Sequence, residues 1–312
     1  MELSRKIFVA GHGGLVGSAL VRQLKAQGYT NIVTRGRAEL DLMCPHAVRT
    51  FFETQRPEYV FLSAGRTGGV YANDTYRADF LYENLILQSN VIHQAFLSET
   101  RKLIFFGCSC MYPKLCAQPM REDALLSGPL EPTNEPFAIA KLAGMKMCES
   151  YYRQYGCDFI TIIPTNLYGL QQDYTPLNCL IIPALIARFH EAKAAHAPKV
   201  SVWGSGRPSR DFLFADDLAD AAIFLMKNYS SAEPINVGSG ADMTVREVAE
   251  TIREVVGYQG DLEFDASKPD GVLMKLQDIS KISGMGWKPR TDFRKGIALA
   301  YEDYLRAPQQ WA

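Results

Sequence analysis

Five apolar segments alternate with helical patterns over the first 170 residues, and this alternation constrains the fold more than any other feature. The segments span residues 6–10, 31–37, 59–65, 102–108 and 158–169, and helical patterns lie between them at 18–27, 78–98 and 137–155. Strands buried on both faces form continuous apolar runs, and strands that alternate with helices form parallel sheets. We therefore predict an α/β fold with a Rossmann-type doubly wound parallel sheet, which binds ligands at the C-terminal ends of its strands.

The pattern changes after residue 170. Short strands at 199–204 and 261–266 mix with helical patterns at 181–195 and 244–256. This arrangement predicts a smaller C-terminal α/β lobe that binds substrate. The expected division is a cofactor-binding domain over 1–170 and a substrate lobe over 171–312, with some segments interleaved.

Composition excludes several classes of partner. The net charge is −1, so no basic excess points to nucleic acid or to an anionic membrane surface. No apolar run reaches the roughly 18 residues of a membrane span, and no signal peptide is recognised. The seven cysteines lack paired C-x-x-C motifs, which favours free thiols in the cytoplasm.

A glycine-rich turn follows the first strand, with the sequence Gly11-His-Gly-Gly-Leu-Val-Gly17. Glycines allow the tight turn and let backbone N–H groups approach a pyrophosphate at a helix N-terminus. The turn predicts a dinucleotide site formed by Gly11, Gly14, Leu15, Val16 and Gly17. The alternative is a glycine turn that binds no ligand.

The tip of the second strand carries Arg35 and Arg37 and no acidic residue. An acid at this place binds the ribose hydroxyls of NAD, whereas an Arg pairs with a 2′-phosphate. We therefore predict NADP(H) as the cofactor, although both arginines can also be ordinary surface residues. Asp41, just beyond, is predicted either to border the adenine pocket or to cap a helix.

Several longer segments carry a family resemblance. They are GHGGLVGSAL, ANDTYRADFLYEN, GCSCMYPK, PLEPTNEPFAIAKLAG, PTNLYG, VWGSG, RDFLFADDLA, INVGSG and FDASKPDG. Together they resemble the GDP-L-fucose synthase family of the extended short-chain dehydrogenase/reductase superfamily. The resemblance implies an NADP(H)-dependent 3,5-epimerase/4-reductase that acts on a GDP-4-keto-6-deoxyhexose. It also implies a homodimer formed through the helices at 78–98 and 137–155, and the alternative is a monomer with a thick core.

The catalytic positions implied by the resemblance are partly replaced. The family uses Ser, Tyr and Lys for reduction, and Cys and His for epimerisation. Here the Ser position is Cys108, the Tyr position is Phe137 and the His position is Leu180, while Lys141 and Cys110 are retained. Outside the reaction centre, family arginines are replaced by Gly13 and Met274.

These replacements remove proton donors. Phe137 keeps an aromatic ring without the hydroxyl, and a general acid contributes about 10²–10⁴-fold to a rate. Cys110 is the expected base for epimerisation, and a neighbouring cation would have to lower the pKa of its thiol. Cys108 is either a substitute proton donor or a small buried apolar residue. No second Cys or His pair stands at ligand spacing, so no metal site is predicted.

The substrate residues implied by the resemblance lie mostly in the second half. Arginines suit a pyrophosphate, and a tryptophan offers a flat wall to a nucleotide. The predicted set is Asn166, Arg188, Trp203, Arg210 and Asp270, with Asn166 also near the cofactor and Lys268 a further candidate. Three functions stay open: the family reaction, a related reaction on another nucleotide sugar, and a pseudoenzyme that binds NADP(H) and GDP-sugar without turnover.

Overall fold

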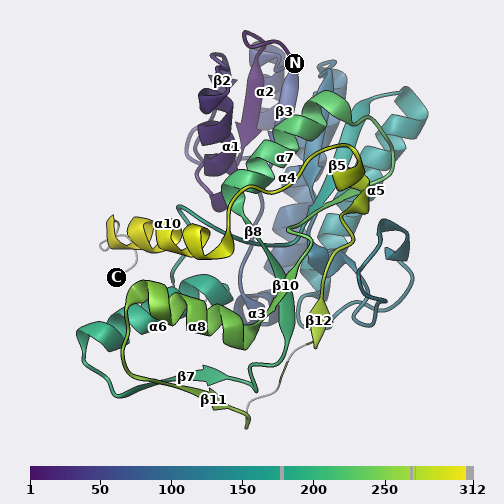
Figure 1. Ribbon diagram of the computed structural model, residues 1–312. Coiled ribbons are helices and arrows are strands. Elements are labelled where there is room, and N and C mark those ends of the chain that lie inside the picture. Colours follow the sequence, from purple (N-terminus) through teal and green to yellow (C-terminus); the bar gives the residue numbers. More distant parts are fainter. Residues whose placement is uncertain (176–178, 268–269, 271, 307–312) are drawn as a thin grey trace.

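The computed structural model describes residues 1–175, 179–267, 270 and 272–306, and a six-stranded sheet forms its centre (Figure 1). The strand order is β2-β1-β3-β4-β5-β9, and every neighbouring pair is parallel. The strands are β1 Ile7–Ala10, β2 Ile32–Val33, β3 Tyr59–Leu62, β4 Lys102–Phe106, β5 Asp158–Pro164 and β9 Ile235–Val237. The predicted Rossmann-type fold is thus confirmed.

Helices cover both faces of this sheet. Successive residues of a strand point to opposite faces, so Ile7 packs with α1 and α7 in one apolar core and Phe8 packs with the other helices in a second. The first face carries α1 Leu15–Ala26 and α7 Ala215–Asn228; the second carries α2 Pro45–Gln55, α4 Arg77–Leu97 and α5 Glu135–Tyr155. Residues 215–237 therefore return to the large sheet after the chain has entered the second lobe.

The last predicted strand, 158–169, is divided in two. Thr165 marks the break, because its N–H bonds to Val237 and its hydroxyl donates to the carbonyl of Asp211. Before it, β5 stays in the large sheet; after it, β6 Asn166–Tyr168 pairs with β8. Asn166 is thereby placed at the junction of the two sheets.

The second lobe contains two small sheets and a third apolar core. One sheet pairs β8 with β10, β12 and β6, and the other pairs β7 with β11. Their bounds are β7 Lys199–Trp203, β8 Ser209–Phe214, β10 Asp242–Thr244, β11 Asp261–Asp265 and β12 Met274–Lys275. The lobe's helices are α6 Ile181–Ala194, α8 Val245–Val256 and α10 Phe293–Arg306, which lie below the large sheet in Figure 1.

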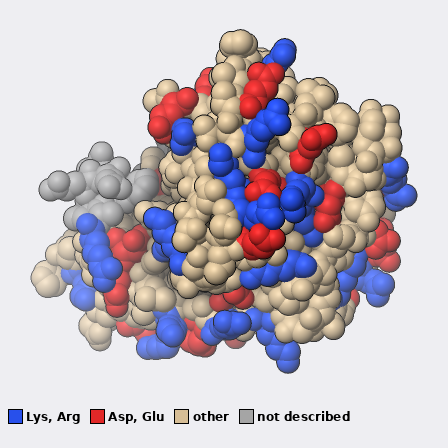
Figure 2. All heavy atoms as spheres, turned by 90° about the horizontal axis from the view of Figure 1, so that it is seen from above, with Lys and Arg blue, Asp and Glu red and all other residues tan. Residues whose placement is uncertain are grey.

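The remaining elements are short and connect these layers. They are α3 Val70–Thr75, α9 Ser280–Gly284 and the 3-10 turns η1 Ser109–Met111 and η2 Glu122–Ala124. Within the described ranges, no helix is long and apolar enough to cross a membrane. Acidic and basic side chains are interspersed over the face shown in Figure 2.

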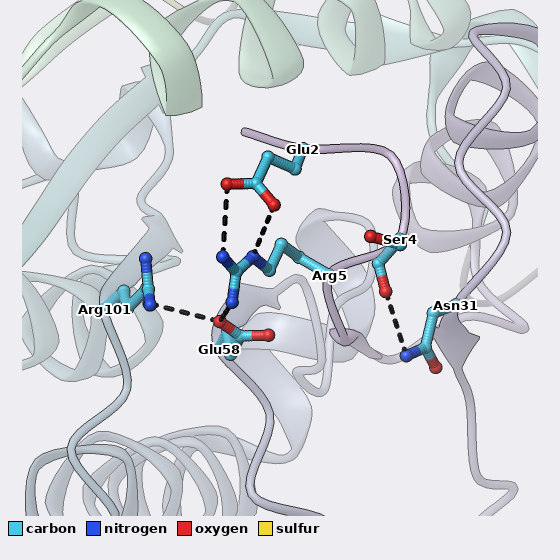
Figure 3. A network of polar contacts seen from close by, with 6 residues as sticks. All are labelled: Glu2, Ser4, Arg5, Asn31, Glu58 and Arg101. Carbon is cyan, nitrogen blue, oxygen red and sulfur yellow. Dashed lines mark hydrogen bonds and ion pairs between the residues drawn. The ribbon is translucent and has the colours of Figure 1, made fainter.

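The N-terminal ends of the strands are joined by a polar network (Figure 3). Arg5 donates to Glu2 and to Glu58, and Arg101 also lies 3.1 Å from Glu58. Asn31 donates to the carbonyl of Ser4. These residues precede β1, β2, β3 and β4, so the network lies at the edge of the sheet opposite the strand ends where ligands are expected.

Candidate active site

The glycine turn between β1 and α1 contains glycines of two kinds. Gly11 has φ +85°, and a Cβ there would lie 2.6 Å from the nitrogen of Ala64. A Cβ at Gly17 would lie 2.0 Å from the oxygen of Gly11. These two glycines are required by the packing of the turn itself. Gly13, by contrast, has no atom within 4 Å of its would-be Cβ, so it borders open space.

The start of α1 is suited to an anion. No side chain caps it and its first turn holds no acidic residue, so the N–H groups of Leu15, Val16 and Gly17 are unpaired by helix geometry. His12, in the same turn, has a buried Nδ1 without a hydrogen-bond partner among the described residues. The turn therefore fits the pyrophosphate of a dinucleotide.

The two arginines after β2 differ in their surroundings. Arg35 donates to the carbonyl of Thr34, and its guanidinium lies 6.0 Å from the Phe51 ring. Arg37 is exposed and makes no hydrogen bond or ion pair within the part of the chain that the structure describes. Glu39 is occupied, because its carboxylate accepts the N–H of Gly36. Arg37 is thus the cation left available to a 2′-phosphate.

Asp41 is not the cap of the next helix, which was one of its two predicted roles. Its carboxylate accepts the N–H of Met43 at 3.0 Å, and Cys44 occupies the N-cap position of α2. Asp41 is exposed, so a role at the adenine pocket stays a prediction.

Lys141 is buried within α5, with 5% of its surface exposed. Its Nζ donates to the carbonyl of Phe106 at the end of β4 and lies 4.9 Å from the Phe105 ring and 5.8 Å from the Phe137 ring. Burial lowers the pKa of Lys141, and the thiols of Cys108 and Cys110 oppose this shift. The lysine therefore lies beside both cysteines at the C-terminal end of a central strand.

Phe137 stands in the first turn of α5 and packs as an aromatic residue. Its ring is perpendicular to that of Phe80, with the centroids 6.0 Å apart. Just before it, the Oδ1 atom of Asn134 is buried without a hydrogen-bond partner among the described residues. This free acceptor could not be recognised from the sequence, which shows only an Asn before a helix.

The two cysteines after β4 form a hydrogen-bonded pair of thiols. Burial raises the pKa of Cys108, but the hydrogen bond from Cys110 and the charge of Lys141 outweigh it, so the pKa is lowered. The same hydrogen bond, together with burial, raises the pKa of Cys110. The hydrogen bond thus favours the ionised form of Cys108, and the role of Cys110 as the base of epimerisation stays a prediction.

Leu180 is the N-cap residue of α6, and 45% of its surface is exposed. An aliphatic side chain there cannot donate a proton.

Lys275, on β12, lies close enough to the two thiols to lower the pKa of both, an influence that the sequence alone did not reveal.

A hollow of about 230 Å³ gathers most of the predicted substrate residues in the second lobe. Arg188, Trp203, Arg210 and Asp270 all line it. Asp270 accepts two hydrogen bonds from Ser205, which lower the pKa of its carboxyl group. Lys268 lies outside the described residues. A larger hollow of about 420 Å³ includes none of the predicted site residues.

Asn166 lies on β6, and its side-chain amide donates to the carbonyl of Asp211 at 3.0 Å. Asp211 itself was not recognised from the sequence. It is fully buried, and burial raises the pKa of its carboxyl group to about 6 despite two hydrogen bonds from Ser239. Its Oδ2 has no partner among the described residues.

A family model described as "NAD dependent epimerase/dehydratase family" matches residues 7–238. The chain is 54% identical over 305 residues to a putative GDP-L-fucose synthase 2 of Arabidopsis thaliana, which covers 98% of this chain and 93% of the relative. It is 50% identical over 310 residues to the GDP-L-fucose synthase of Escherichia coli strain K12, covering 96% and 97%.

Solved structures of nucleotide-sugar enzymes are also similar to this chain. A GDP-6-OMe-4-keto-L-xylo-heptose reductase from Campylobacter jejuni superposes with a TM-score of 0.93 at 39% identity, covering 98% of this chain and 99% of that one. A GDP-L-fucose synthetase from Naegleria fowleri bound to NADP superposes with a TM-score of 0.91 at 26% identity, covering 99% and 97%.

Proposed function

The chain belongs to the NAD dependent epimerase/dehydratase family, and we propose that it is an NADP(H)-dependent nucleotide-sugar epimerase/reductase of the GDP-L-fucose synthase type. Its proposed substrate is a GDP-4-keto-6-deoxyhexose. The observation that carries the proposal is the 54% identity over 305 residues, because it spans both the glycine turn and the nucleotide hollow.

The cofactor end of the site uses the turn and the arginines. The N–H groups at the start of α1 hold the pyrophosphate, Arg37 pairs with the 2′-phosphate, and Asp41 borders the adenine. Asn166 contacts cofactor and substrate from β6. When bound, NADPH supplies a hydride to the substrate. Lys141 orients the nicotinamide ribose and places a positive charge near the carbonyl oxygen that is reduced.

The substrate end uses the hollow of the second lobe. Arg188 and Arg210 face the same space and suit the two charges of a pyrophosphate. Trp203 supplies a flat apolar wall, and Asp270 offers a carboxylate held by Ser205. The proposed division of the chain is a cofactor-binding part within 1–170 and a nucleotide-sugar lobe within 171–312, with 215–237 contributing to the large sheet.

Proton transfer falls to the thiols and the lysine, since Phe137 and Leu180 cannot donate. Cys108 ionises first, so it is the stronger candidate for a base, and Cys110 keeps a proton that it can donate. We assign the acid in reduction to Cys108, Cys110 or a water beside Lys141. Because neither the cysteines nor a water replaces the tyrosine hydroxyl fully, we expect turnover to be slow compared with a tyrosine-containing site.

A second function is favoured by Phe137 and Leu180. Both remove a proton donor while the turn and the hollow are kept, which is the pattern of a protein that binds NADP(H) and GDP-sugar without turnover. A related reaction on another nucleotide sugar is the third possibility. A panel of GDP-, UDP- and dTDP-sugars analysed by mass spectrometry separates it from the first two.

We also propose a cytoplasmic homodimer. All seven cysteines are free thiols. Exposed apolar side chains lie along α4 and α5, with Tyr82 60% exposed and Tyr155 53% exposed. A second copy packed along these helices would cover them. Sedimentation equilibrium should give twice the chain mass, and Tyr82→Glu should shift it toward the monomer.

The decisive experiment follows NADPH oxidation with GDP-4-keto-6-deoxy-D-mannose, for the wild type beside Phe137→Tyr. Slow but enzyme-dependent oxidation by the wild type supports the reductase. No oxidation by the wild type, restored by combined Phe137→Tyr, Cys108→Ser and Leu180→His, would reject the reductase and leave the binding protein or a reaction on another nucleotide sugar. Calorimetry that detects neither NADPH nor GDP binding would exclude both the reductase and the binding protein.

A further inference from the structure

We propose that Cys108 and Cys110 form a reversible intrachain disulfide, which makes this dithiol an oxidation site within the active site. The two side chains already contact each other through a thiol–thiol hydrogen bond. Only the effect of the disulfide on turnover rests on the proposed function; its formation does not.

The local backbone places the Cα atoms of the two cysteines within the range that a disulfide spans. Ser109, between them, begins the 3-10 turn η1. A helical residue between two Cα–Cα steps of about 3.8 Å places the outer Cα atoms about 5.5 Å apart. Disulfides span Cα separations of about 4.4–6.8 Å. The separation of the two Cα atoms is therefore compatible with a disulfide.

The turn is held from both sides, so the pair stays together. The N–H of Cys108 donates to the Sδ atom of Met111 at 3.3 Å, and the N–H of Met111 bonds to the carbonyl of Cys108. Met111 is fully buried in the second apolar core. Both cysteine residues keep part of their surface exposed.

The charges around the pair favour attack by Cys108. A thiolate is the nucleophile in thiol–disulfide exchange, and neighbouring cations stabilise it. Lys141 and Lys275 both lie near the two thiols, and the hydrogen bond from Cys110 adds to their effect on Cys108. Among the residues that the structure describes, no third Cys, His, Asp or Glu joins the pair in a metal-binding group.

The reaction is an exchange with a small-molecule disulfide such as glutathione disulfide. The Cys108 thiolate attacks one sulfur, and one glutathione leaves as its thiolate. Cys110 then loses its proton and attacks the Cys108 sulfur of the mixed disulfide, releasing the second glutathione. The protein dithiol is oxidised by two electrons, the glutathione disulfide is reduced, and the two thiol protons pass to the two glutathiones.

The disulfide would remove both proton-carrying sulfurs from the site. A disulfide sulfur neither ionises nor donates, so the charge of Lys141 would lose the thiolate beside it. We expect oxidised protein to lose NADPH-oxidising activity and dithiothreitol to restore it.

The test uses the full chain and one peptide. The segment 103–114 lies between Lys102 and Lys114 and contains both cysteines and no other, so trypsin isolates the pair. The folded protein is incubated with glutathione disulfide, free thiols are blocked with N-ethylmaleimide, and the digest is analysed by mass spectrometry. We expect peptide 103–114 without any maleimide and lighter by two hydrogens, and a loss of two of the seven titratable thiols.

A second measurement needs no oxidation. Phenylarsine oxide binds two neighbouring thiols at once, so it should protect peptide 103–114 from N-ethylmaleimide. Cys108→Ser and Cys110→Ser should each abolish this protection. Cys44→Ser, which alters an exposed cysteine at the start of α2, should leave the protection unchanged.

The outcomes separate this inference from the proposed function. A mixed disulfide that persists on Cys108, a bridge from Cys108 to a different cysteine, or equal maleimide labelling with and without phenylarsine oxide would overturn the inference. An internal disulfide in a protein that never oxidises NADPH would confirm the inference and reject the reductase. Activity that survives complete closure of the disulfide would show that the two sulfurs are not its proton carriers.

Discussion

The Nζ atom of Lys141 lies 5.8 Å from the centroid of the Phe137 ring, one turn earlier on α5. A buried ammonium group thus faces an aromatic ring without a hydroxyl, while its hydrogen bond goes to the carbonyl of Phe106. The ionisable thiols of Cys108 and Cys110 also lie near it and oppose the lowering of its pKa by burial. The lysine that would assist a tyrosine here interacts with sulfur instead.

Phe137→Tyr should raise turnover. The new hydroxyl would stand on the same ring beside Lys141, whose charge would favour its ionised form and make it a better acid. We expect kcat for NADPH oxidation to rise about 10²-fold, the lower end of what a general acid contributes, because the thiols already supply part of the protons. Phe137→Leu, which adds no donor, should not raise kcat, and an equal increase in both variants would contradict the explanation.

Lys141→Met should make Cys108 less reactive. The positive charge of Lys141 lowers the pKa of Cys108, so its removal raises that pKa and leaves less thiolate at neutral pH. The pH midpoint for alkylation of Cys108 by iodoacetamide should move upward, measured as the rate of modification of peptide 103–114. Lys146→Met removes an exposed lysine from the same helix that pairs with Glu149, and it should leave the midpoint unchanged.

Gly11→Ala should lower the stability of the protein, whereas Gly13→Ala should leave it nearly unchanged. At Gly11 the backbone has φ +85° and a Cβ would lie 2.6 Å from Ala64, so we expect a loss of about 1–3 kcal/mol in the free energy of unfolding. At Gly13 a Cβ meets no atom within 4 Å, so stability should stay within about 0.5 kcal/mol. Urea unfolding measures the change in the free energy of unfolding for both variants.

Gly13→Ala should instead weaken NADPH binding, because its Cβ would enter the space beside the uncapped start of α1. Calorimetry with NADPH tests this on a fully folded variant. Unchanged affinity would mean that the pyrophosphate does not approach Gly13.

The sequence predicted the large sheet because its strands are continuous apolar runs and each is followed by a helix. It did not predict that 158–169 divides at Thr165, since the break depends on bonds to Val237 and Asp211, which are distant in sequence. It also placed Arg188, Trp203, Arg210 and Asp270 in one substrate set, and they do line one hollow. Motifs record local chemistry, whereas burial depends on the assembled chain.

The thiol pair shows the same limit. The family resemblance implied that Cys108, Cys110 and Lys141 share one site, but it could not say how the two thiols influence each other. That depends on the direction of their hydrogen bond and on Lys275 from β12, both of which are set by tertiary structure.

Arg210→Ala should weaken GDP binding. Arg210 lines the hollow on β8, and a charge-assisted hydrogen bond to a phosphate contributes about 1.5–3 kcal/mol. We expect the Kd for GDP to rise about 10- to 100-fold by calorimetry. Arg207→Ala changes an exposed neighbour that does not line the hollow, and it should have little effect. Equal losses in the two variants would point to general charge attraction instead.

Asp211 should make stability depend on pH in an unusual direction. Its pKa is raised from 3.8 to about 6 in the folded protein, so the folded state holds a proton between these values and the unfolded state does not. Stability from this residue therefore increases as pH falls from about 6 to about 4, by about 1.4 kcal/mol per pH unit and about 3 kcal/mol in all. Asp211→Asn cannot titrate, yet its Oδ1 can still accept from Ser239. The free energy of unfolding of both proteins is measured with urea at pH 4.5, 5.5 and 7. The wild type should gain stability relative to the variant as the pH is lowered. A difference that is constant across the three pH values would show that the Asp211 carboxyl group has an ordinary pKa.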